Sequence, residues 1–101
     1  MLRHIVMIKF NQGIALDEAK QELKEMLLNL PQTIDTLKSM QVGLNIGTKI
    51  AAYHLVLTAD FEDEAGLDAY RIHPDHVKVL KRLESIVEKT AAVDYLLDGN
   101  E

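Results

Sequence analysis

Residues 2–10 of this 101-residue chain read LRHIVMIKF, and their pattern indicates the class of fold. Its β-branched residues Ile5, Val6 and Ile8 are typical of a strand. Side chains alternate across a strand, so one face carries Leu2, His4, Val6, Ile8 and Phe10. The other face carries Ile5 and Met7. Because both faces are apolar, we expect both to be covered, one by helices and the other by a further layer.

After this strand the pattern alternates between helical and extended periodicity. The predicted elements are a helix over 16–30, strands over 37–46 and 53–61, helices over 62–70 and 74–87, and a last strand over 90–96. The order β-α-β-β-α-β, with the second helix broken near His73, is that of a ferredoxin-like α+β fold. Its helices cover one sheet face. We therefore expect the open face to meet a second sheet, most simply that of an identical chain.

Composition narrows the class of protein. The length suits one domain, which we place at residues 1–98 with a frayed tail at 99–101. A hydrophobic fraction of 48% excludes intrinsic disorder, and a net charge of −5 with only 5% aromatic residues opposes nucleic-acid binding. No apolar run reaches the roughly 18 residues of a membrane span. The absence of cysteine excludes disulfides and thiolate chemistry. We expect a cytoplasmic protein that binds neither nucleic acid nor membrane.

Candidate chemistry lies in residues 69–76, AYRIHPDH. Pro74 suits the first turn of a helix, which places His73 at the N-cap and His76 in the first turn. The positive end of a helix disfavours imidazolium, so His76 is expected to be neutral and able to accept a proton. Tyr70, across the helix break, is a hydroxyl donor for the same space.

Two interpretations of these side chains stay open. His76 and Tyr70 either buttress the helix break, with His76 bonded to a backbone carbonyl, or they face a ligand. His4, a polar side chain on an apolar strand face, is either a satisfied core histidine or a polar group of a pocket. We expect His54 at the surface or an interface. His73 and His76 have no evident third ligand, so no metal site and no cofactor are predicted.

Three segments together resemble the stress-responsive dimeric α/β-barrel (Dabb) family. They are the opening RHIV at 3–6, HLVLTADF at 54–61 and the pattern A-Y-x-x-H-P-x-H at 69–76, and VDY at 93–95 fits the family's last strand. The resemblance covers nearly the whole chain. It implies a ferredoxin-like protomer that forms a homodimeric barrel, with a pocket between sheet and helices.

The family includes a plant polyketide cyclase, and this resemblance implies roles for three residues. His76 would be the general base, Tyr70 would assist as a proton donor, and His4 would lie in the same pocket. The residues that the resemblance implies as the pocket lining are Val6, Ile8, Leu57, Val79 and Val87. The cyclase pocket is rich in aromatic residues, whereas this chain offers the aliphatic Leu23, Met26 and Leu27, so a ligand of different shape is implied.

The expected function is that of a small homodimeric, stress-associated protein that takes a small apolar ligand. The alternative is a cofactor-free enzyme of the lyase or cyclase kind. Cofactor-free monooxygenases share the fold, but fold alone does not indicate oxygen chemistry. A cavity of about 300 Å³ on which His4, Tyr70 and His76 converge would favour ligand binding or catalysis. An interior filled by Leu23, Met26 and Leu27 would favour a structural role.

Overall fold

The order of elements along the chain is the predicted one. The computed structural model describes residues 1–97 and contains β1 (Leu2–Phe10), α1 (Leu16–Asn29), a short 3₁₀ helix η1 (Leu30–Gln32), β2 (Ser39–Leu44), β3 (Leu55–Phe61), α2 (Glu64–Ile72), α3 (Pro74–Glu84) and β4 (Val87–Leu96). The strands form one sheet in the order β2-β3-β1-β4, and every neighbouring pair is antiparallel. This confirms the ferredoxin-like α+β fold.

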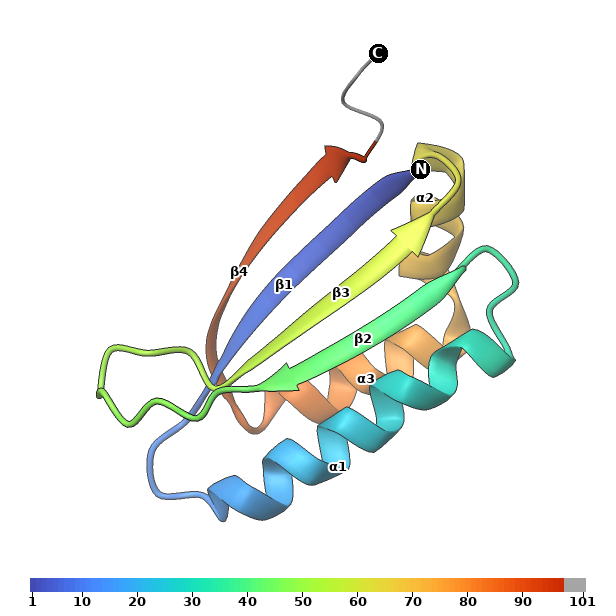
Figure 1. Ribbon diagram of the computed structural model, residues 1–101. Coiled ribbons are helices and arrows are strands. Elements are labelled where there is room, and N and C mark those ends of the chain that lie inside the picture. The colour runs from blue at the N-terminus through green and yellow to red at the C-terminus, as the bar shows by residue number, and fades with distance from the viewer. Residues whose placement is uncertain (98–101) are drawn as a thin grey trace.

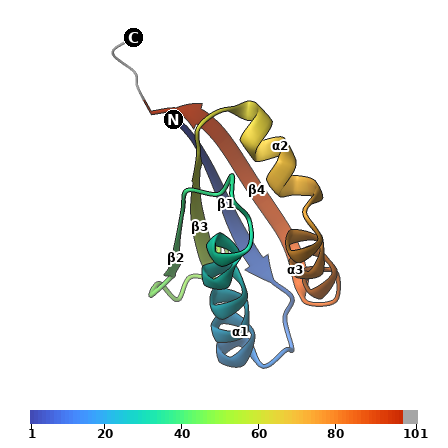
Figure 2. The same cartoon turned by 90° about the vertical axis from the view of Figure 1, so that its right-hand side faces the viewer.

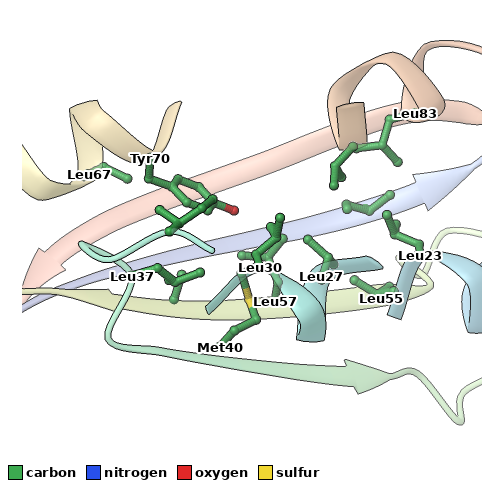
Figure 3. Packing of buried hydrophobic residues seen from close by; sticks show 14 of the residues in the cluster. Leu23, Leu27, Leu30, Leu37, Met40, Leu55, Leu57, Leu67, Tyr70 and Leu83 are labelled. Carbon is green, nitrogen blue, oxygen red and sulfur yellow. The ribbon is translucent and has the colours of Figure 1, made fainter. Parts of the chain in front are cut away.

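The three helices lie on one face of the sheet (Figures 1 and 2). The even-numbered residues of β1 face the helices, as the alternation predicts, and Leu2, Ile8 and Phe10 are buried. The opposite face remains open, with Met7 39% exposed. Figure 3 shows how side chains of the helices and of the sheet interdigitate in the core. The core therefore lies entirely between the two layers.

A side-chain cap begins each of the helices α2 and α3, and the cap of α3 lies in the break between them. The Asp63 carboxylate accepts a hydrogen bond from the Gly66 backbone N–H and begins α2. His73 Nδ1 accepts one from the Asp75 N–H at 3.1 Å and begins α3, with Pro74 in the first turn. The predicted N-cap role of His73 is confirmed. The break brings the end of α2 and the start of α3 together beside the sheet.

Several element boundaries differ from the predicted ones. α3 ends at Glu84, so the prediction that Val87 belongs to this helix is wrong; Val87 begins β4 and pairs with Phe10. The chain leaves the helix at Ser85, which has the C-cap position, and Ile86 N–H still bonds the Leu83 carbonyl. β2 is shorter at both ends than the predicted strand over 37–46, and β3 begins at Leu55 instead of at 53. The tail predicted at 99–101 lies outside the described residues. Within residues 1–97, no helix is long and apolar enough to cross a membrane.

Candidate functional site

Three predicted site residues from three elements come together at the α2–α3 break. The ring centroids of Tyr70, in the last turn of α2, and His76, in the first turn of α3, are 4.2 Å apart. The His4 ring on β1 lies edge-on to Tyr70 at 6.4 Å. Tyr70 is 1% exposed, and Figure 3 shows it extending from α2 into the space between helices and sheet. The juxtaposition follows from the break, since a continuous helix would carry His76 away from this space.

The hydrogen bond of His76 decides which of its nitrogens is free. Its Nδ1 lies 3.1 Å from the Arg71 carbonyl oxygen. A carbonyl can only accept, so Nδ1 carries the proton and the neutral ring keeps a lone pair on Nε2. Burial lowers the pKa of His76, and the nearby charges of His4, Arg71 and His73 act in the same direction, against the bond to the Arg71 carbonyl. The neutral imidazole is thus a proton acceptor at Nε2 near pH 7.

Tyr70 supplies a hydroxyl that keeps its proton. Burial raises its pKa well above the ordinary tyrosine value, so the phenol is not ionised at neutral pH. Within residues 1–97 this hydroxyl forms no hydrogen bond. Next to the neutral His76, Tyr70 therefore offers a donor that is not already committed.

Asp94 is a member of this group that sequence reasoning missed. It lies directly opposite His4 in the β1–β4 register, and its Oδ1 is 2.5 Å from His4 Nδ1. Because a carboxylate only accepts, the bond holds the His4 proton on Nδ1. Arg71 contacts the second Asp94 oxygen at 3.3 Å and Asp68 at 3.2 Å. Only the register between β1 and β4 identifies Asp94 as a neighbour of His4, and no local sequence pattern predicts this register.

The interior around these side chains is closely packed. Of the residues implied as pocket lining, Ile8, Leu57 and Val79 belong to the buried core, and Val6 and Val87 are partly buried against it. Leu23 and Leu27 on α1 are each 1% exposed. The space between the layers is thus filled in the way that favours a structural role for the core.

A small cavity of about 220 Å³ adjoins the group from outside, lined in part by Leu67, Arg71 and Asp94. It is smaller than the roughly 300 Å³ at which small-molecule pockets begin. A ligand that reaches Tyr70 from this cavity must move side chains of the helix layer.

Other candidate residues lie apart from this group. His54 precedes β3 at the opposite end of β1, half-buried, and its Nδ1 accepts a hydrogen bond from the Phe10 backbone N–H at 2.9 Å.

No cluster of three or more histidine, aspartate or glutamate side chains that could hold a metal ion occurs in the described part of the chain.

Comparison with known proteins identifies relatives over nearly the whole chain. The family model for the Stress responsive A/B Barrel Domain matches residues 2–97. The Stress-response A/B barrel domain-containing protein DABB1 of Arabidopsis thaliana is 32% identical over 97% of this chain. The alignment covers 48% of that relative, so the chain spans about half its length.

Two further relatives match over nearly their whole length. Olivetolic acid cyclase of Cannabis sativa is 27% identical over 93% of this chain and 94% of its own. A dimeric protein of unknown function with a ferredoxin-like fold from Bacteroides fragilis is 29% identical in sequence, with a TM-score of 0.83 over 93% of each chain.

Proposed function

Because the chain belongs to the stress-responsive A/B barrel domain family, we propose that it works as a homodimer joined through the open face of its sheet. The solved relatives from Bacteroides fragilis and Thermobifida fusca are described as dimeric, which supports this assembly. The names of the family and of its Arabidopsis member support a stress-associated role.

The observation that carries the proposal is an apolar patch on the open face. Met7 pairs with Val56 on β3, and Ile5 pairs with Val93 on β4, so these side chains form one surface. Met7, Val56 and Val93 are 39%, 36% and 54% exposed, and Tyr95 extends the patch along β4. A contiguous apolar patch on a small domain marks an interaction surface, and a second copy covers it by a symmetric contact.

A polar cluster borders the patch and supports a defined contact geometry. Arg3 donates two hydrogen bonds to the Asp60 carboxylate, at 2.9 and 3.0 Å, and Ser39 donates a third at 3.0 Å. The guanidinium lowers the pKa of Asp60, which therefore stays charged. These groups are satisfied within one chain, so covering them with a second sheet leaves no unpaired carboxylate.

Sedimentation velocity at about 10 µM tests the assembly. We expect the wild type to sediment as a dimer and Val93→Asp as a monomer, because the carboxylate would be buried without a partner. Leu80→Asp is the matched control, since Leu80 is 44% exposed on α3, on the helix side. It should remain a dimer. A monomeric wild type, or a dimeric Val93→Asp, contradicts the proposal.

A second candidate function is proton transfer on a small, largely apolar carbonyl compound. The Tyr70–His76 pair carries it, because a neutral base at Nε2 and an unionised phenol lie side by side. In this reaction His76 Nε2 removes a proton from the carbon next to the carbonyl. The C–H electron pair forms a carbon–carbon double bond and the carbonyl π pair moves onto the oxygen, and the resulting enolate accepts a hydrogen bond from Tyr70. The likeness to olivetolic acid cyclase supports this chemistry. His4, whose ring centroid lies 6.4 Å from that of Tyr70, would orient the substrate.

Deuterium exchange into phenylacetone, followed by proton NMR in D₂O, measures this step directly. His76→Asn keeps an amide donor for the Arg71 carbonyl but removes the base, and we expect exchange to fall by about 10²-fold or more. Tyr70→Phe should lower it by about 10²-fold. His73→Asn keeps the helix cap and should leave exchange unchanged. Wild-type exchange no faster than that of His76→Asn contradicts catalysis and leaves the homodimer proposal intact.

A further inference from the structure

A larger cavity lies at the opposite end of the sheet from Tyr70 and His76. Its volume is about 800 Å³, and it is bounded by the end of β1, the turn that leads into α1, and the loop over residues 45–54. Figure 1 shows the β2–β3 loop and the β1–α1 connection at the same end of the molecule. This cavity shares no lining residue with the group around His4.

Lys9 lies at the wall of this cavity with its charge unmatched. It is 9% exposed, and its Nζ donates a hydrogen bond of 2.7 Å to the Ile50 carbonyl. Over residues 1–97 no carboxylate forms an ion pair with it. Buried lysines are ordinarily paired, and one carbonyl satisfies one of three ammonium donors. The ammonium therefore has the capacity to bind an anion in the cavity.

Two more lysines line the same cavity. Lys49 is exposed on the loop, and Lys20 comes from α1. Lys20 Nζ is 3.6 Å from an Asp17 oxygen, but Asp17 is 97% exposed, so this pair is solvated and weak. None of the described residues that line the cavity is acidic, although the chain has a net charge of −5. The described lining of the cavity therefore carries three ammonium groups and no carboxylate.

His54 adds a neutral donor to the lining. The Phe10 N–H donates to its Nδ1, so the ring proton is on Nε2. Burial, together with Lys20 and Lys9, lowers the pKa of His54 against the opposing effect of Glu88. Protonation of Nδ1 would break the bond to Phe10. The ring therefore remains neutral, with an N–H available to an acceptor.

The rest of the lining is apolar. Phe10, Ile14 and Leu16 contribute from β1, the turn and α1. On the loop, Ile46 and Ile50 are 98% and 84% exposed, although isoleucine is among the residue types that are most often buried. They offer apolar area beside the lysines that a bound hydrocarbon group would cover.

We propose that this cavity binds a small amphipathic organic anion, with its charged head against Lys9, Lys20 and Lys49 and its hydrocarbon body against the loop isoleucines. Such a ligand fits the site better than a purely inorganic ion does. The cavity is large enough for it, the buried ammonium is unmatched, and apolar side chains adjoin the lysines. The site is separate from the Tyr70–His76 group and does not depend on its chemistry.

Isothermal titration calorimetry with octanoate tests the proposal on the full chain. We expect one octanoate site per chain, with octanol binding at least about tenfold more weakly because it lacks the charge. Lys9→Met keeps the aliphatic stem and should weaken octanoate binding by about tenfold or more. Lys49→Met should weaken it by about threefold. Lys81→Met, on the exposed side of α3, should bind as the wild type does.

The remaining outcomes are decisive as well. Binding of octyl phosphate as tightly as octanoate supports the site and shows that the head is not restricted to a carboxylate. If circular dichroism shows that Lys9→Met does not fold, the octanoate affinities of Lys49→Met and Lys81→Met are compared instead, and equal affinities overturn the proposal. Octanol binding as tightly as octanoate overturns the proposal. So does a Lys9→Met variant that changes the sedimentation coefficient but not octanoate affinity, because the cavity would then belong to a contact between copies.

Discussion

His76 and His54 lie near opposite ends of β1, and their environments assign them opposite tautomers. His76 Nδ1 faces the Arg71 carbonyl, which accepts, whereas His54 Nδ1 faces the Phe10 N–H, which donates. Burial is the largest cause of a lowered pKa in both. One neutral ring is therefore a proton acceptor at Nε2 and the other a donor there.

The difference shows that the backbone partner, and not the residue type, determines the chemistry of each histidine. His54 extends the sheet where strand pairing stops: its own N–H donates to the Ile8 carbonyl, and its ring accepts from Phe10, two residues further along β1. His76 instead bonds a carbonyl in the break between α2 and α3. The His54 ring takes the place of a strand carbonyl as hydrogen-bond acceptor, and the His76 ring lies in a helix break.

The largest expected effect comes from removing the His54 acceptor. His54→Leu leaves the Phe10 N–H without a partner in a residue that is 1% exposed, which should cost about 1–3 kcal/mol of unfolding free energy. His54→Asn restores an acceptor and should recover most of this loss. His76→Leu should cost less, because it frees a carbonyl on the exposed Arg71, which water can reach.

Urea unfolding at one fixed protein concentration measures these differences, since a dimer's stability depends on concentration. Equal losses in His54→Leu and His76→Leu would show that the partner atom does not distinguish the two rings. A His54→Asn variant as unstable as His54→Leu would assign the loss to packing instead of the hydrogen bond.

The pH dependence of stability is the next effect. Both histidines have a folded-state pKa below the ordinary value of about 6.5, so the unfolded chain binds more protons between the two values. Their contribution is fully present above about pH 6.5 and is lost as pH falls from there toward the folded-state pKa. We expect up to about 1 kcal/mol to be lost between about pH 7.5 and 5.5.

A matched set of variants isolates this effect. His54→Asn and His76→Asn should each flatten the unfolding free energy over this interval, because the replaced side chain no longer titrates. The Asp60 carboxylate, whose pKa is lowered by Arg3, affects stability only below about pH 5, outside this interval. A double variant that keeps the full slope between pH 7.5 and 5.5 would refute the assignment to these histidines.

Local sequence patterns predict the parts of the molecule that local physics determines. Alternation in residues 2–10 predicts β1 and both of its faces, and Pro74 after His73 predicts the helix break that brings Tyr70 and His76 together. The end of α3 could not be placed, because apolar residues at 86 and 87 suit helical and extended periodicity equally well.

What remained hidden from the sequence depends on long-range pairing. Asp94 meets His4 only through the β1–β4 register, and the two residues are 90 positions apart. Lys9 Nζ meets the Ile50 carbonyl only through the return of the loop over 45–54, and the two residues are 41 positions apart. Residues 47–52 of this loop follow neither helical nor strand periodicity, and in the structure the strands predicted over 37–46 and 53–61 both stop short of the loop, so no local pattern predicts where it lies. The tautomers of His54 and His76 depend on the same kind of contact.

The smallest expected difference is the position of one proton on each ring, which can be measured in the wild type without changing its stability. Two-bond ¹H–¹⁵N correlation spectra at about pH 7.5 should show His76 with its proton on Nδ1 and His54 with its proton on Nε2. His73→Asn, which keeps its cap, should leave both patterns unchanged and, by the signal that it removes, identify His73 among the four histidines. Because each assignment follows from one backbone partner, a shared tautomer would mean that one of the two hydrogen bonds is absent in solution. A proton on Nε2 of His76 would remove the base from the proton-transfer mechanism, and one on Nδ1 of His54 would remove the neutral donor from the anion cavity.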